Sequence, residues 1–337
     1  MHFTTVLQPF FLFISLATSI LALPHTGPNP TGSPNLPLPS RVLYQFPKGS
    51  WIENLAVRSD GDLLLDVMST PSLYLLDPHT LGVLGITELQ HDVFYIITGN
   101  YSLTTGSDGP GTYALWKVEL SGQHNATKAI TRKVTDIPEA RLLNSVIPLR
   151  EDGEGDTVLI SDSDLGVVWQ LNVNTAEYSI LIDVPEMKYP PGAALPIGIN
   201  GLRLRGDHLY WANSEQNLFC RVKVDCNGKA MGAVEVLVRN VTFIDDFVFD
   251  KDGTAWLALD ESWEIGTIKA GQANATIVLG ASDQLTVAGP TSVKFGRSSG
   301  FEDTLFVATN GGLASPRNGT IFEGAKILAV DTRGFGH

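Results

Sequence analysis

The chain has 337 residues, of which 43% are hydrophobic and 18% charged, and its formal net charge is -13. This apolar content excludes an intrinsically disordered protein, and the acidic balance argues against nucleic acid or an anionic membrane as a partner, since either requires clustered Lys and Arg. The composition predicts a globular protein with an acidic surface.

The N-terminal 40 residues have the pattern of a secreted protein. Residues 6–22 are apolar and uncharged and end in small residues, which predicts a signal peptide over residues 1–22. An uncleaved signal anchor is the alternative, because no Lys or Arg precedes the apolar run. Residues 23–40 are rich in Pro and Gly and predict a flexible lead. No later apolar run could span a bilayer, so we expect one domain over residues 41–337 and a secretory location without a membrane span.

The glycosylation sequons and the two cysteines are further features that we relate to a secretory location. Two cysteines, Cys220 and Cys226, lie six residues apart, and an oxidising compartment would allow them to pair if the chain reverses near Asp225. Two inert buried thiols are the alternative. Five N-x-S/T sequons predict N-glycosylation at Asn100, Asn125, Asn240, Asn274 and Asn318.

A loose repeat runs through the rest of the chain. Short apolar runs rich in Val, Ile, Leu, Phe and Tyr are bounded by Gly, Asp, Asn or Pro, which is the all-β pattern. Six such units begin at Glu53, Gly85, Asn144, Asn200, Asp245 and Thr291, and most are followed by a second strand pair. Units of about four strands predict an all-β fold, a six-bladed β-propeller, with a two-sheet sandwich array as the alternative.

The residues that open these units are candidates for a cation site. The first strand of a propeller blade lines the central channel, so its opening residue can point to the axis. Two carboxylates and two carboxamides would then converge, namely Glu53, Asn144, Asn200 and Asp245. Such oxygen ligands suit Ca²⁺ or another hard divalent cation. The alternative is that they only hold water, since Asn and Asp are common before strands.

Several units resemble a known propeller family. NGLRLRGDHLYWANS, DDFVFDKDGTAW and PTSVKFGRSSGFEDTLFVAT are similar to blade motifs of the gluconolactonase and senescence-marker-protein family, and the similarity extends from Glu53 to about Thr309. This resemblance implies a metal held by Glu53, Asn144, Asn200 and Asp245. The chain departs from the family pattern at NLAV after Glu53 and at Asp246, which occupies the place of a glycine.

A second resemblance is to a fungal branch of secreted propellers. FPKGSWIENLAVRSDGDLL, GITELQHDVFYIITGNYSL and PTSVKFG are similar to the branch that contains the hetero-Diels–Alderases of tropolone sesquiterpenoid biosynthesis. This resemblance implies a pericyclase that joins a polyketide-derived quinone methide to a humulene-type sesquiterpene, without an organic cofactor.

A pericyclase needs an apolar pocket that holds the reactants and one or two hydrogen-bond donors. A core role is the alternative for each aromatic residue. The sequence singles out no catalytic residue, and the pocket candidates are Trp51, Phe94, Tyr95, Tyr101, Trp211, Asp246, Phe247 and Trp263.

Two other function classes stay open. A calcium-dependent lactonase would use the cation to polarise an ester and Asp245 or Asp246 as the base. A non-catalytic binding propeller is the third class. The sequence has neither a G-x-S-x-G elbow nor an H-E-x-x-H motif, which argues against serine hydrolases and zinc proteases.

Overall fold

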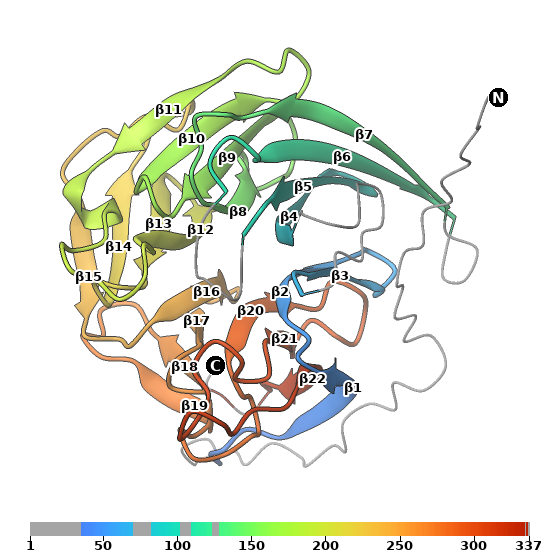
Figure 1. Ribbon diagram of the computed structural model, residues 1–337, viewed down its shortest axis with the longest axis vertical. Coiled ribbons are helices and arrows are strands. Elements are labelled where there is room, and N and C mark those ends of the chain that lie inside the picture. The colour runs from blue at the N-terminus through green and yellow to red at the C-terminus, as the bar shows by residue number, and fades with distance from the viewer. Residues whose placement is uncertain (1–34, 70–81, 102–108, 123–127, 334, 336–337) are drawn as a thin grey trace.

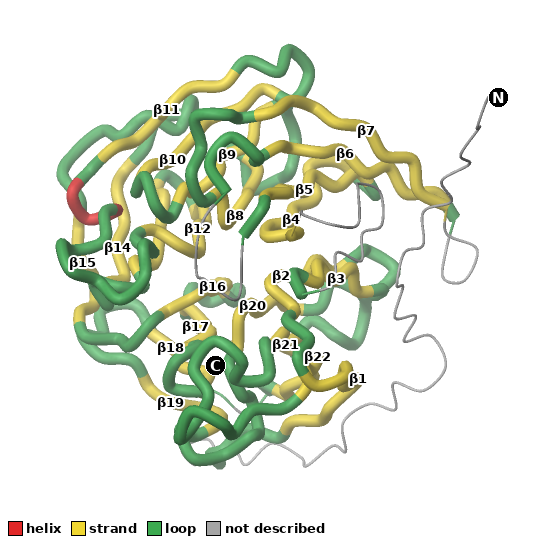
Figure 2. The backbone as a smooth tube through the Cα atoms, viewed as in Figure 1, coloured by secondary structure: helices red, strands yellow, loops and turns green. Residues whose placement is uncertain are grey.

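The structure is a computed structural model that describes residues 35–69, 82–101, 109–122, 128–333 and 335. The expected signal peptide, most of the lead and the sequon at Asn125 lie outside these residues. Within them the chain forms antiparallel sheets arranged around a centre (Figure 1). Only one short 3-10 turn, Pro185–Met187, is helical among the described residues (Figure 2), and none of their helices has the length and apolar character needed to cross a membrane.

Five sheets have four strands each. One blade consists of β8(Leu143–Pro148), β9(Thr157–Asp162), β10(Val167–Asn172) and β11(Tyr178–Asp183). The next consists of β12(Ile199–Arg205), β13(His208–Asn213), β14(Leu218–Lys223) and β15(Glu235–Arg239). A third consists of β16(Ile244–Phe249), β17(Ala255–Leu259), β18(Glu264–Ile268) and β19(Thr276–Gly280). A fourth consists of β4(Gly82–Gln90), β5(Val93–Gly99), β6(Ala114–Ser121) and β7(Lys128–Asp136). In each of them the strands follow one another in chain order.

The fifth blade joins the two ends of the domain. It runs from β20(Pro290–Phe295) through β21(Thr304–Thr309) and β22(Gly324–Asp331) to β1(Ser40–Lys48), the first described strand. β1 pairs antiparallel with β22, from Ser40 opposite Val330 to Lys48 opposite Gly324. Backbone hydrogen bonds between distant parts of the sequence therefore close the ring.

The sixth position in the ring holds a sheet of two strands, β2(Ile52–Val57) and β3(Leu63–Val67). The prediction of six four-stranded blades is therefore wrong for the described residues, which have five. The second strand pair that the repeat predicts for this unit, at residues 71–78, falls within residues 70–81, outside the described part of the chain.

The inner strands β2, β4, β8, β12, β16 and β20 contact one another around the axis. All six predicted unit starts lie on them. Their first residues are buried, and β2 is buried throughout, whereas an outer strand such as β11 is mostly exposed or partly buried. Apolar clusters fill the spaces between neighbouring blades, as where Tyr95 of β5 and Val146 of β8 share one cluster. This packing fixes the inner strands that carry the candidate site.

Candidate functional site

A β-bulge recurs near the start of every inner strand. The register with the second strand shifts in all six cases, and the residues that the shift leaves without a partner include Glu53, Asn144, Asn200 and Asp245. The corresponding residues of β4 and β20 are Leu84 and Thr291. A bulge re-aims a side chain that would otherwise follow the strand's alternation. This repeated irregularity therefore directs one side chain per inner strand toward the same end of the channel, except where Thr291 instead bonds to the Ile52 carbonyl.

Glycine accompanies two of these bulges for a steric reason. A Cβ on Gly85 would lie 2.2 Å from the carbonyl oxygen of Asn144, and a Cβ on Gly201 would lie 2.8 Å from the Cα of Asp246. Neighbouring inner strands therefore approach too closely for a side chain. The prediction that Gly85 opens its unit is off by one residue, because Leu84 lines the pocket there.

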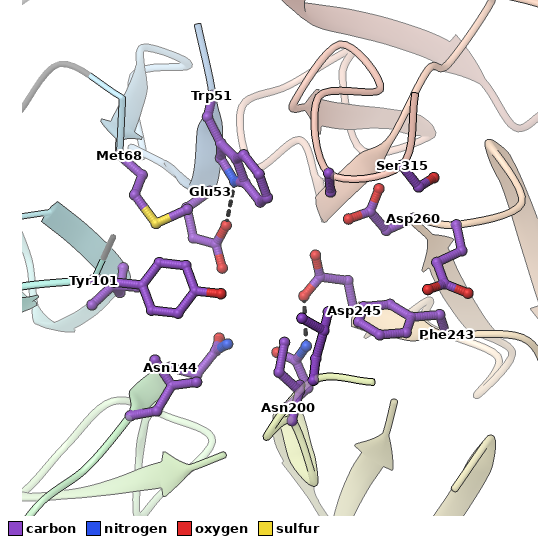
Figure 3. Close-up of a pocket in the computed structure, with 16 residues that line it drawn as sticks. Trp51, Glu53, Met68, Tyr101, Asn144, Asn200, Phe243, Asp245, Asp260 and Ser315 are labelled. Carbon is purple, nitrogen blue, oxygen red and sulfur yellow. Dashed lines mark hydrogen bonds between the residues drawn. The ribbon is translucent and has the colours of Figure 1, made fainter. Parts of the chain in front are cut away.

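The bulged residues open into a pocket of about 80 Å³, which we call the near mouth of the channel. Carboxylates, amides and a phenol converge on its centre from several strands (Figure 3). Its walls are largely apolar. The lining residues are Trp51, Glu53, Met68, Leu84, Tyr101, Leu142, Asn144, Leu195, Ile197, Asn200, Phe243, Asp245, Asp260, Glu261, Ala314 and Ser315.

Two hydrogen bonds order the polar groups of the near mouth. The indole N–H of Trp51 donates to Glu53 Oε2 at 2.6 Å, and Asn200 Nδ2 donates to Asp245 Oδ1 at 2.8 Å. Figure 3 shows the Tyr101 hydroxyl and the Asn144 amide pointing toward the space between these two pairs. The pocket therefore offers both donors and acceptors to a bound group.

Burial makes the carboxyl groups of the near mouth difficult to ionise. It raises the pKa of Glu53 to about 7 against the opposing effect of the Trp51 hydrogen bond, and the charges of Asp260 and Asp246 raise it further. Burial, followed by the Glu53 charge, raises the pKa of Asp245 well above its usual value. Near neutral pH these groups share protons, so the site can donate hydrogen bonds from carboxyl groups as well as accept them.

Asp260 is a pocket residue that the sequence analysis missed. Asn310 Nδ2 donates to both of its carboxylate oxygens, at 3.1 and 3.0 Å, and burial raises its pKa to about 7 despite these bonds. It follows β17 rather than opening a blade, so our search of unit starts passed over it. The signal was present as a second acidic cluster, Asp260-Glu261, at the end of an apolar strand.

Trp51 and Tyr101 are the aromatic candidates that line the near mouth. Our prediction is wrong for the other five, since Phe94, Tyr95, Trp211, Phe247 and Trp263 are at most 4% exposed and absent from the lining. Alternation along the strands turns Phe94, Tyr95, Trp211 and Phe247 into the packing between sheets. Trp263 does not line the pocket. The Arg317 guanidinium lies over its ring at 4.5 Å, close in sequence to the lining residues Ala314 and Ser315.

Asp246 also points away from the near mouth. Its Oδ2 accepts hydrogen bonds from Arg203 at 2.7 Å, Ser292 at 2.8 Å and Lys294 at 3.0 Å. Burial opposes its ionisation, but the charges of Arg203 and Lys294 outweigh it and lower the Asp246 pKa. An ionised carboxylate held by two cations is not a residue of the near mouth, which corrects its assignment as a pocket candidate or base.

The four candidate cation ligands do lie around one pocket. Asn200 Oδ1 is buried and has no hydrogen-bond partner among the described residues, which fits an oxygen-seeking cation. The described His, Cys, Asp and Glu residues form no group of three or more that could hold a metal ion. Any cation here would thus depend on the amides of Asn144 and Asn200 as well as on Glu53 and Asp245.

The cysteines do not pair in the structure. Cys220 is buried on β14, and Cys226 is exposed beyond the end of that strand. The chain reverses only after Asp225, where Gly228 N donates to the Asp225 carbonyl, so the reversal does not bring the two thiols together. The alternative of two free thiols holds, although only one of them is buried.

No protein-family model matches the chain. A protein of Phoma sp named "Putative hetero-Diels-Alderase" is 29% identical over 322 residues, covering 85% of this chain and 90% of the relative. A protein of Sarocladium schorii named "Putative hetero-Diels-Alderase asR5" is 30% identical over 350 residues, covering 89% of this chain and 85% of the relative. The solved structure of regucalcin, a calcium-binding protein of Agrobacterium tumefaciens, matches with a TM-score of 0.53 at 13% identity and covers 88% of this chain and 94% of that one, which supports the propeller fold alone.

Proposed function

This chain belongs to the family of the hetero-Diels-Alderase homologues just described, and from that premise we propose that it is a pericyclase working in the near mouth. The reaction we assign is a hetero-Diels–Alder addition of a polyketide-derived tropolone quinone methide to a humulene-type sesquiterpene. The four atoms C=C–C=O of the quinone methide and one C=C of the terpene form one C–C and one C–O bond. No atom is lost, so neither a nucleophile nor an oxidant is required.

The observation that carries this proposal is the distribution of polarity in the near mouth. Apolar side chains such as Leu84, Ile197 and Phe243 form the walls, while the polar groups gather around the centre. An apolar wall favours a hydrocarbon, and a few donors suffice to polarise the oxygen of the hetero-diene. Tyr101 and Asn144 are the donors that we assign to that oxygen.

The size of the near mouth constrains how the reactants lie. At about 80 Å³ it is smaller than the 150 Å³ cavity that admits benzene in an engineered protein core. We therefore place only the oxygen-bearing end of the quinone methide inside it. The terpene lies across the opening, where Trp51 and Leu195 offer apolar contact.

A direct assay tests this proposal. Purified protein is incubated with a quinone methide precursor and humulene, and the yield and enantiomeric excess of the dihydropyran product are measured. We expect faster and more selective formation than in buffer, with Tyr101→Phe slowing turnover about tenfold by loss of one donor. Product formed at the uncatalysed rate, with no selectivity, would contradict the proposal.

A calcium-dependent lactonase is the second candidate, favoured by the unpartnered Asn200 Oδ1 beside Glu53 and Asp245. A Ca²⁺ ion held by Glu53, Asn144, Asn200 and Asp245 would polarise an ester carbonyl. Robust hydrolysis of a sugar lactone that EDTA or Asp245→Ala abolishes would establish this activity in place of the pericyclase. No hydrolysis of the lactone with Ca²⁺ present, together with activity on the two reactants that survives EDTA, would contradict it.

We also propose that the protein enters the secretory pathway and carries N-linked glycans. Four of the five sequon residues, Asn100, Asn240, Asn274 and Asn318, are exposed, as glycan attachment requires. Mass spectrometry of protein secreted from a fungal host should find an N-terminus near Leu23 and a mass decrease after endoglycosidase treatment. An intact Met1 with no such decrease would contradict the proposal.

A further inference from the structure

A second cavity lies where the inner strands end. It has a volume of about 220 Å³, nearly three times that of the near mouth, and we call it the far mouth. Its lining residues come from the later parts of β4, β8, β12 and β20 and from the turn after β8, namely Ile86, Thr87, Val146, Ile147, Pro148, Arg150, Glu151, Arg203, Leu204 and Lys294. None of them belongs to the near mouth.

The floor of the far mouth holds two cations and one carboxylate. Arg203 and Lys294 both bond to a single oxygen, Asp246 Oδ2, at 2.7 and 3.0 Å, and Ser292 donates to the same oxygen. The side chains of Arg203 and Lys294 are only 14% and 21% exposed. The Asp246 carboxylate carries one negative charge against the two positive charges of Arg203 and Lys294. The other acidic group near Lys294 is Asp66, whose pKa burial raises well above its ordinary value, so the floor retains an excess positive charge in a chain whose net charge is -13.

The two cations also have donors to spare. Lys294 carries three N–H donors and makes one hydrogen bond among the described residues, to Asp246. Arg203 carries five, and its bonds there go to Asp246 and to the Leu202 carbonyl. Partly buried donors that lack protein acceptors can serve an acidic group entering the cavity.

The remaining charges of the far mouth lie on its rim. Arg150 pairs with Asp152 at 2.7 Å, and both are exposed. Glu151 is exposed as well and accepts a hydrogen bond from the backbone N–H of Gly206. Water and salt screen rim charges more than those of the floor, so the floor determines which ligand charge is favoured.

The walls of the far mouth determine the rest of the ligand. Val146 and Ile147 are buried apolar residues, and Pro148 and Leu204 complete the apolar part of the lining. Phosphate has no apolar part that could contact these residues, whereas an organic acid has one. We propose that the far mouth binds a small organic carboxylate, with its carboxylate on Arg203 and Lys294 and its apolar body against Val146, Pro148 and Leu204.

Calorimetric titration with benzoate, benzamide and inorganic phosphate tests this site without any turnover assay. We expect benzoate to bind at least tenfold more tightly than either control compound, because benzamide lacks the charge and phosphate lacks the apolar body. Equal binding of benzoate and benzamide, or tighter binding of phosphate, would overturn the proposal.

Variants with opposite expected effects locate the binding. Lys294→Met should weaken benzoate binding at least tenfold, and Asp246→Asn should strengthen it by releasing both cations from their internal partner. Arg150→Gln, on the rim, and Trp51→Ala, in the near mouth, should each change it less than twofold. If Lys294→Met fails to fold, the test is the rise in melting temperature that benzoate causes. We expect a larger rise in Asp246→Asn than in the unmodified protein, and a smaller or equal rise overturns the proposal.

Discussion

The two mouths of the channel share the inner strands β4, β8 and β12 and yet differ in charge. At the near mouth, Glu53, Asp245 and Asp260 are buried carboxyls whose pKa values are raised. At the far mouth, Arg203 and Lys294 hold Asp246 ionised. Asp245 and Asp246 are neighbours in sequence, so one peptide bond separates a carboxyl whose pKa burial raises from a carboxylate whose pKa nearby cations lower.

This difference shows that a bulge, rather than composition, decides what each end of the channel can bind. The register shift in β16 leaves Ile244 opposite Leu259 and Phe247 opposite Leu257, with Asp245 and Asp246 between them. Asp245 lines the near mouth, and Asp246 reaches the cations of the far mouth. Substitutions in the core or backbone should therefore affect both mouths, and substitutions of lining residues should affect one mouth alone.

The largest effect is expected for Phe247→Ala, which removes a ring that packs edge-on against Phe219 at 4.9 Å in the core. Deleting a buried Phe costs about 3–5 kcal/mol of unfolding free energy, and the loss should impair both mouths alike. Denaturant unfolding measures it, with Phe247→Leu as the milder control. Unchanged stability combined with altered product stereochemistry would instead place Phe247 in the pocket.

Trp51→Ala should act on the near mouth alone. We expect turnover to fall about 100-fold, equivalent to about 2.7 kcal/mol, because the change widens the pocket and removes the hydrogen bond to Glu53. Stopped-flow product formation measures it. Trp51→Phe keeps an aromatic ring but not the N–H, so its turnover separates the loss of shape from the loss of the donor.

Gly201→Ala should disturb both mouths through the backbone. The added Cβ would lie 2.7 Å from Asp246 Oδ1 and 2.9 Å from the Asp245 carbonyl oxygen. Overpacking of this kind costs about 1–3 kcal/mol. Gly232→Ala is the matched control, because nothing lies within 4 Å of its added Cβ. If both variants melt at the same temperature, strands β12 and β16 are not as close as described.

The near mouth should also make stability depend on pH. Asp260 has a folded pKa of about 7, above its ordinary value of 3.8, so the folded state binds the extra proton between these two values. The contribution of Asp260 to stability is therefore greatest below about pH 4 and falls as pH rises to about 7, with a slope of at most about 1.4 kcal/mol per pH unit for one proton. Asp260→Asn should flatten this slope in urea unfolding from pH 4 to 7.

A control at the far mouth completes that comparison. The pKa of Lys294 is lowered to about 8 by burial and by the charge of Arg203, so it keeps its proton throughout the window from pH 4 to 7. Lys294→Met thus removes no group that titrates in this window, so any change of slope that it causes reports the Asp246 carboxyl, whose pKa Lys294 lowers. An unchanged slope in Asp260→Asn would mean that Asp260 stays ionised in the folded protein.

The inner strands could be read from the sequence because each carries an apolar run opened by a polar or small residue, as in Asn144 and Asn200. The bulges could not, because a register shift depends on the pairing with the second strand. Without them the aromatic residues could not be sorted between core and pocket, and Phe247 was misplaced for that reason. Asp260 was missed because its role depends on Asn310, which lies fifty residues later in the chain.

The pairing of β1 with β22 has a consequence for how the chain acquires its fold. β1 leaves the ribosome early, but its partner lies near the end of the described chain, so the ring cannot close until synthesis of the domain is almost complete. Closure of such a long loop is entropically costly and slow. Until it occurs, the edge of β22 stays open to strands of other chains. A chaperone that shields this edge during synthesis would therefore raise the yield of folded protein.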